Sequence, residues 1–263
     1  MYKIAFSCHI DVAFSVVNKY NFRFTNICSF LFYIILLPNF VILEFFYKIS
    51  SMRSPFEIVG NVPFDLSVLQ SIFPDCKHIT DKARSLEAEG RIVRLKKGLY
   101  VASQQETEIP VCRELVANHL YGPSYVSLQT ALRFYGLIPE FVYMVCSITT
   151  KQSRDFENKI ASFHYQNCSP EYFPLGIRME HRDNYSYLIA SPEKALCDLI
   201  AFTPRLQFRS MLDIGGWLEQ DIRFDMDELA TFDEELLQQI AEHSRKRNSI
   251  ITLISFLRHE KLI

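Results

Sequence analysis

Residues 63–101 carry a series of apolar spacings that restricts this part of the chain to one order of elements. In the first part, apolar side chains recur at helical spacing after Asp65, which is placed to cap a helix. A second helical stripe precedes Gly90 and consists of Ile79, Ala83 and Leu86. Residues 91–95 and 99–101 then form two short β-type runs around a turn that contains glycine. The predicted order is helix, helix, β-hairpin.

This order is that of a winged helix-turn-helix domain, which we predict for residues 52–104. In such a domain the second helix enters the major groove of DNA, and the hairpin, or wing, lies along the phosphate backbone. Residues 54–62 depart from the pattern, because they are too few and too closely bounded by glycine and proline for a full first helix.

The predicted wing and the helix before it are basic in a chain that is slightly acidic overall. Residues 76–101 contain seven Lys or Arg against three Asp or Glu, whereas the whole chain has a formal net charge of −2. Because DNA affinity depends strongly on phosphate contacts, we predict DNA contacts from this region. The candidate DNA-binding residues are His78, Thr80, Lys82, Arg84, Arg94, Lys96 and Lys97. The alternative is a hairpin whose lysines only keep its edge exposed, with Thr80 as a helix cap and His78 as a surface residue.

The first 51 residues differ in composition from the rest of the chain. They hold 13 of the 36 aromatic residues and no glycine or glutamine, and their bias toward residues with AT-rich codons is typical of translated intergenic DNA. Residues 30–47 are nearly all apolar, but Pro38 interrupts them, so they are borderline for a membrane-spanning helix. We expect residues 1–51 to be a non-native upstream extension, with the true start at Met52. A real membrane anchor is the alternative.

Composition narrows the class of protein. Of the 263 residues, 49% are hydrophobic and 22% are charged, which excludes a wholly disordered chain and a protein with several membrane spans. The seven cysteines have no CxxC motif or regular spacing, which argues against a zinc site and a disulfide framework. We therefore expect a cytoplasmic protein without a metal or another cofactor.

A polar stretch at residues 104–110 separates the basic region from a larger segment, residues 110–204. Two helical stripes, residues 113–120 and the run that Ser127 is placed to cap, precede a series of β-type runs. The strand candidates are residues 142–150, 160–165, 176–180 and 185–189. A serine–proline pair then opens another helix at Ser191. The predicted fold is α+β, with a small, mostly antiparallel sheet.

Residues 205–263 form a predicted C-terminal helical subdomain. Residues 219–235 are strongly acidic, and apolar residues then recur at helical spacing through a final amphipathic helix. A basic cluster lies between the last two helices and is either a solvated face or a second phosphate contact. It consists of Arg245, Lys246 and Arg247.

Residues 122–140 have the sequence GPSYVSLQTALRFYGLIPE. This stretch resembles the signature of AbiE-type antitoxins, which are the transcriptional regulators of type IV toxin–antitoxin or abortive-infection operons. Further motifs resemble that family in the same order along the chain. They are residues 147–150 with Arg154 and Phe156, and residues 191–198. The resemblance covers residues 55–205, whereas residues 1–51 have no counterpart in it.

The resemblance implies that a winged-helix domain represses its own operon and that a second domain neutralises a nucleotidyltransferase toxin in phage defence. In type IV systems the antitoxin is thought to oppose the effect of the toxin without a stable complex. The implied partners are therefore operator DNA and, functionally, the toxin. Within the second domain, polar side chains of the signature are expected to form one exposed antitoxin surface. These are Tyr125, Ser127, Arg133, Thr149, Thr150 and Arg154. Alternatively, Ser127 only caps a helix and Tyr125 only packs in the core.

Sequence motifs of enzymes are weak in this chain. It contains no GxGxxG, P-loop, GxSxG or HExxH motif. Residues 215–216 and 225–227 faintly resemble a nucleotidyltransferase pattern, and Glu193 with Lys194 and Asp198 resembles that of a metal-dependent nuclease. We therefore predict that the protein is not an enzyme. A metal-dependent nuclease or a nucleotidyltransferase-like defence enzyme is the alternative.

Overall fold

The computed structural model describes residues 54–140 and 143–262. The expected upstream extension at residues 1–51 lies outside the described residues, as does the expected start at Met52. The described residues belong to one compact unit with both helices and strands. Within them, no helix is both long enough and apolar enough to cross a membrane.

The first elements follow the predicted order of helix, helix and hairpin. They are β1 (Phe64–Asp65), α4 (Leu66–Ile72), α5 (Ile79–Ala88), β2 (Ile92–Lys96) and β3 (Leu99–Ala102). Asp65 caps α4 as predicted, because its carboxylate accepts hydrogen bonds from the backbone N–H groups of Ser67 (2.9 Å) and Val68 (3.0 Å). Residues 54–62 form turns rather than a helix, consistent with the departure seen in the sequence.

The hairpin of β2 and β3 has buried residues on both of its faces, while Arg94, Lys96 and Lys97 remain exposed. With β1 it forms a three-stranded antiparallel sheet in the order β1-β3-β2. Ile92, Tyr100 and Ala102 belong to a smaller hydrophobic core that includes residues of α4 and α5. Leu95 and Val101 instead belong to the core of the larger sheet and helices that follow. The hairpin is therefore shared between two cores.

The polar stretch at residues 104–110 is not an open linker, because it contains a short helix, α6 (Gln104–Thr107). Glu106 on this helix accepts a hydrogen bond from the Arg91 guanidinium, with Nε and Oε1 2.6 Å apart, and another from the Ser54 hydroxyl. The stretch is thus fastened to the residue before β2, which its composition did not indicate.

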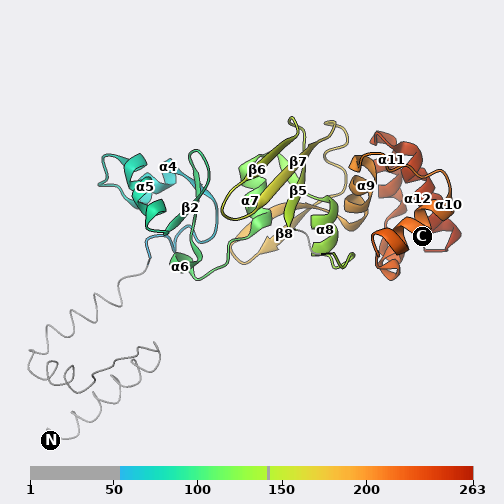
Figure 1. The fold of residues 1–263 in the computed structure, drawn as a ribbon, viewed down its shortest axis with the longest axis horizontal. Helices are drawn as coiled ribbons and strands as arrows, with labels where there is room; N and C mark the ends of the chain where they lie inside the picture. The colour runs from blue at the N-terminus through green and yellow to red at the C-terminus, as the bar shows by residue number, and fades with distance from the viewer. Residues whose placement is uncertain (1–53, 141–142, 263) are drawn as a thin grey trace, which may run out of the picture. The chain divides into compact units, whose positions relative to one another are not determined.

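The larger segment forms a six-stranded sheet with helices packed against it (Figure 1). Its elements are α7 (Arg113–Leu120), β4 (Ser124–Val126), α8 (Leu128–Phe134), β5 (Met144–Thr149), β6 (Arg154–Glu157), β7 (Ser162–Asn167), β8 (Ile177–Arg182) and β9 (Tyr185–Ala190). The strand order is β6-β7-β5-β4-β9-β8, in which β5–β7 and β4–β9 are parallel and the other three pairings are antiparallel. A mostly antiparallel sheet is confirmed. Strands β4 and β6 are absent from those predicted from the sequence.

The predicted C-terminal helices are confirmed, and Figure 1 shows them grouped beside α9 (Pro192–Phe202), the last helix of the larger segment. They are α10 (Met211–Gly216), the π-helical turn η1 (Trp217–Asp221), the 3-10 helix η2 (Met226–Thr231), α11 (Glu234–His243) and α12 (Arg247–His259). Helix α9 begins as predicted, because the Ser191 hydroxyl accepts from the backbone N–H of Lys194 and Pro192 occupies the first turn. Residues 193–201 are all buried. Helix α9 is therefore the centre of this group.

The basic cluster between α11 and α12 is partly committed to internal contacts. The Lys246 ammonium donates to three main-chain carbonyls at the end of α9, those of Ile200 (3.0 Å), Thr203 (2.5 Å) and Leu206 (2.8 Å). Arg245 stacks its guanidinium 4.7 Å from the centre of the Phe202 ring. Lys246 is thus a helix-capping residue. The prediction that the cluster is a second phosphate contact is therefore wrong for Lys246, whose ammonium is already bound to these carbonyls.

Candidate nucleic-acid interface

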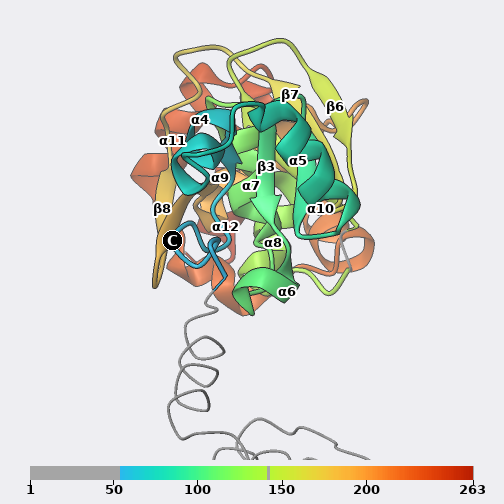
Figure 2. The same ribbon diagram turned by 90° about the vertical axis from the view of Figure 1, so that its left-hand side faces the viewer.

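Helix α5 presents predicted DNA-binding residues to solvent, and Figure 2 shows this helix on the side that faces the viewer. The exposed ones on the helix and at its start are His78, Thr80 and Arg84. Arg84 pairs with Asp81 at 2.8 Å, but both side chains are more than 60% exposed, so water weakens the pair. Lys82 is half-buried, with its ammonium 5.1 Å from the centre of the Phe73 ring.

The excess positive charge lies on the hairpin rather than on α5. Helix α5 contains two cationic and two acidic residues, whereas residues 91–101 contain four cationic and no acidic residues. Arg94 and Lys97 are exposed. A polyanion that approached this part of the protein would therefore be attracted mainly to the hairpin.

Lys96 is turned toward the larger sheet. Its Nζ donates a hydrogen bond to the main-chain oxygen of Leu120, the last residue of α7, over 2.5 Å. Lys151 binds the main-chain oxygen of Gly122 in the same way, also over 2.5 Å. Burial lowers the pKa of Lys96, and the positive charges of Lys151 and Arg154 lower this pKa further. We call Lys96, Lys151 and Arg154 the junction cations, because they come from the hairpin and the larger sheet and lie near one another.

Aromatic rings lie beneath two of the junction cations. Tyr121, Phe156 and Tyr165 form a cluster in which ring centres are 5.3–5.7 Å apart. The Lys151 ammonium lies 5.3 Å from the centre of the Tyr121 ring, and the Arg154 guanidinium lies 4.9 Å from that of Phe156. Lys151 is missing from the residues predicted from the sequence, although it directly follows the motif at residues 147–150.

Three of the six residues expected on the antitoxin surface are buried, namely Tyr125, Ser127 and Thr149. The hydroxyls of Tyr125 and Ser127 donate to Oδ2 of Asp198, over 3.1 and 2.6 Å. The Thr149 hydroxyl donates to the main-chain oxygen of Pro123 over 2.7 Å. Ser127 precedes α8 as predicted, but its side chain makes no capping hydrogen bond. The expectation of one exposed face is wrong for these three residues.

Two further buried side chains contact the Asp198 carboxylate. The Tyr172 hydroxyl donates to its Oδ1 over 2.6 Å, and the Lys194 ammonium lies 3.5 Å from the same oxygen. The Lys194 ammonium also donates to the main-chain oxygen of Tyr172 over 3.0 Å. Both Lys194 and Asp198 have no exposed surface. Burial lowers the pKa of Lys194, while the charge of Asp198 opposes that effect. This network joins β4, the loop before β8 and α9.

The other three residues of the expected surface differ in their surroundings. Arg133 and Arg154 are exposed, and Thr150 is half-buried. The Arg133 guanidinium donates to the main-chain oxygens of Ile138 (3.4 Å) and Pro139 (3.5 Å), in the loop after α8. Arg154 is instead one of the junction cations. The structure therefore leaves two arginines, in different surroundings, available to a partner.

The residues of the weak enzyme patterns have structural contacts. Glu193 is buried at the start of α9, and Asp198 already accepts from three hydroxyl groups. Residues 215–216 lie in the last turn of α10 rather than in a loop, and Asp225 caps η2 by accepting from the N–H of Asp227. Among the described residues, no three or more His, Cys, Asp or Glu side chains are grouped so that they could hold a metal ion.

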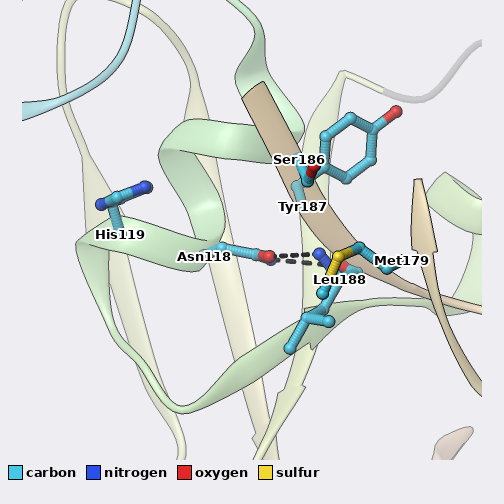
Figure 3. A pocket seen from close by; sticks show the side chains of 6 residues that line it. All are labelled: Asn118, His119, Met179, Ser186, Tyr187 and Leu188. Atoms are coloured by element: carbon cyan, nitrogen blue, oxygen red, sulfur yellow. Dashed lines mark hydrogen bonds between the residues drawn. The ribbon is translucent and has the colours of Figure 1, made fainter. Parts of the chain in front are cut away.

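A small pocket of about 160 Å³ lies between α7 and the last two strands (Figure 3). Its lining residues are Asn118, His119, Met179, Ser186, Tyr187 and Leu188. The Asn118 amide accepts from the N–H of Leu188 (2.6 Å) and donates to its main-chain oxygen (3.3 Å), as a neighbouring strand would. Asn118 thereby joins α7 to β9. Asn118 therefore has a structural role in the pocket, and none of the predicted site residues lines this pocket.

Comparison with known proteins does not add to this geometry: no protein-family model matches the chain, and no curated protein matches it significantly.

Proposed function

We propose that this protein is a DNA-binding antitoxin of the AbiE type, which represses its own type IV toxin–antitoxin operon and counteracts a nucleotidyltransferase toxin in phage defence. The exposed basic hairpin beside α5 is the observation that carries the DNA-binding part. The antitoxin part rests on the resemblance of residues 122–140 and of the two later motifs. The proposal places the protein in the cytoplasm and requires no metal or other cofactor.

In this proposal, β1–β3, α4 and α5 form a winged helix. Helix α5 enters the major groove, where His78, Thr80 and Arg84 reach base edges or phosphates, and the hairpin lies along the backbone. The exposed positions of these side chains support this arrangement. Arg94 and Lys97 are the hairpin residues with free access to phosphates.

The proposed DNA-binding surface continues from the hairpin onto the larger sheet. Lys151 and Arg154 are exposed, and the pKa of Lys96 is lowered by both of their charges, which is consistent with all three lying on one side of the protein. None of these three cations forms an ion pair with a described carboxylate. Lys151 and Arg154, which are exposed, are suited to phosphates, since binding then releases counterions from DNA.

Titration of the full chain with a duplex from the promoter of its own operon tests the proposed repressor. We expect tighter binding to this duplex than to a scrambled duplex, and for both duplexes a linear fall of log affinity with log salt concentration. Arg84→Ala should weaken operator binding about tenfold or more, and less so for the scrambled duplex, if Arg84 contacts a base. Equal affinity for both duplexes would contradict the role of operator-specific repressor.

Asp81→Asn is the matched control for Arg84→Ala. Asp81 is the partner of Arg84, so both variants break the same exposed ion pair. Only Asp81→Asn, however, removes a negative charge from the surface that faces DNA, and it should tighten binding to both duplexes. If both variants weakened binding equally, the ion pair itself and not Arg84 would be responsible.

The antitoxin part is tested by co-expression with a nucleotidyltransferase encoded beside this gene. The full chain should restore growth to cells that express this toxin. Arg133→Gln should reduce the rescue while leaving operator binding unchanged, whereas Arg154→Gln should weaken operator binding, because Arg154 is a junction cation. Rescue that is unaffected by Arg133→Gln would place the antitoxin surface elsewhere.

A further inference from the structure

Two hydrogen bonds fasten adjacent residues of β2 to the larger segment, one to the loop between β6 and β7 and one to the end of α7. The main-chain oxygen of Leu95 accepts from the Asn158 side-chain amide over 3.4 Å, and Lys96 donates to the main-chain oxygen of Leu120 over 2.5 Å. The Leu95 side chain is itself buried in the larger core. The hairpin is therefore held against the larger segment by packing and by two polar contacts.

The contact of Lys96 is favoured by its position. Leu120 is the last residue of α7, where main-chain carbonyls lack helical partners and the negative end of the helix dipole attracts a cation. Lys97, the next residue, lies in the turn of the hairpin; both lysines are exposed, but it is Lys96 that donates to a main-chain oxygen of α7. Two adjacent lysines thus have different surroundings, although they are equivalent in the sequence pattern.

We infer that Lys96 is a positioning residue, which acts on DNA binding by fixing the hairpin against the end of α7 rather than by contacting a phosphate. This inference rests on the proposed DNA-binding function. It divides the exposed cations of the hairpin into Lys96, which holds the hairpin in place, and Lys97 and Arg94, which meet DNA. It also makes the larger sheet a determinant of where the hairpin lies relative to α5.

The test compares Lys96→Met with Lys97→Met in the full chain by two measurements. Amide hydrogen exchange of residues 92–102 in the free protein reports whether the hairpin is held, and operator binding against salt concentration reports the number of phosphate contacts. Lys96→Met should speed exchange several-fold and weaken operator binding, with a change of less than about 0.3 in the salt slope. Lys97→Met should leave exchange unchanged and reduce the slope by about 0.9.

Asn158→Ala is a second variant that involves no charge. It removes the hydrogen bond to the Leu95 oxygen and cannot remove a phosphate–cation contact. Faster exchange in residues 92–102, with weaker operator binding at an unchanged salt slope, would support positioning by the larger sheet. A smaller salt slope and unchanged exchange in Lys96→Met would overturn the inference. If the full chain bound no DNA, the proposed function would fail, but the exchange measurements would still decide whether Lys96 holds the hairpin.

Discussion

Asp198 and Lys194 form an ion pair that has no solvent exposure, at the contact between β4 and α9. Removal of one partner of a buried ion pair leaves the other charge uncompensated, at a cost of about 3–5 kcal/mol. We therefore expect Asp198→Asn and Lys194→Met each to lower the free energy of unfolding by about this amount. Urea denaturation of the two variants checks it.

The double variant Asp198→Asn/Lys194→Met is the control for this pair. Because it leaves neither charge uncompensated, its loss of stability should be smaller than the sum of the two single losses. Strict additivity would mean that the two charges do not stabilise each other, and that the hydroxyl donors alone account for the burial of Asp198.

The lowered pKa of Lys194 predicts a pH dependence with a definite sign. A lysine whose pKa is lower in the folded state than its ordinary value of 10.5 releases its proton more readily when folded, so the unfolded chain binds more protons and stability rises with pH. Asp198→Asn removes the charge that most opposes this lowering. Between pH 7 and pH 9 the stability of Asp198→Asn should therefore gain more than that of the unchanged protein. An equal or smaller gain would contradict a charged, buried Lys194.

Local sequence patterns indicate what a residue can do but not which distant residue it meets. Ser127 stands where a capping serine is expected, yet its hydroxyl binds Asp198, which is 71 positions away in the chain. Tyr125 shares this acceptor. The alternative in which Tyr125 only packs was closer to the structure than the exposed surface. The periodicity of a single helix or strand contains no information about such pairings.

At the level of whole elements, the end of α9 depends on a side chain from the start of α12. The Lys246 ammonium donates to three carbonyls there. A hydrogen bond to a charged group contributes about 1.5–3 kcal/mol to stability. Lys246 is half-buried, so part of this loss is recovered by hydration. We expect Lys246→Met to lower the free energy of unfolding by about 2 kcal/mol, measured by chemical denaturation.

Arg247→Met provides a comparison at the next position. Arg247 is exposed at the first residue of α12, where a cation gains nothing from the helix dipole. Its replacement should change stability by less than about 0.5 kcal/mol. Equal losses in both variants would show that charge in this cluster, rather than the capping contacts of Lys246, stabilises the helices.

Elements with strong periodicity or clear end signals were predicted well, and those without them were missed. Both helices before the hairpin, the hairpin itself and the start of α9 agree with their patterns, because caps, glycines and apolar stripes coincide there. Strand β4 has only three residues, and β6 has four, of which three are charged and do not alternate with apolar residues. Strand β4 lies below the length at which alternation indicates a strand, and β6 has no alternation to indicate one.

Considered as a whole, the described chain does not divide cleanly at residues 104–110. Leu95 and Val101 are buried in the larger core, so a fragment of residues 54–104 would expose them. We expect this fragment to lack a cooperative thermal transition by circular dichroism and to bind the operator at least about tenfold more weakly than the full chain. A fragment that folded cooperatively and bound with full affinity would show that the smaller core suffices.

The two-sided burial of the hairpin could not be predicted from its sequence. Arg91–Val101 alternates well enough to indicate two strands, but an alternating pattern suggests one buried and one exposed face. The structure buries residues on both faces, because α4 and α5 cover part of one face and the larger sheet and its helices take residues from the other. Domain boundaries drawn from polar composition alone do not account for an element that two cores share.

The short strand β4 has a consequence for the order in which the chain folds. It lies in the middle of the six-stranded sheet, yet its parallel neighbour β9 begins about sixty residues later, with Val126 opposite Ile189. Such a pairing closes a long loop for few hydrogen bonds, so it becomes favourable only after the intervening strands have assembled. The two sides of the sheet would then form separately and meet late at β4. A newly made chain would expose unpaired strand edges until that step, which makes this pairing the stage of folding most vulnerable to aggregation.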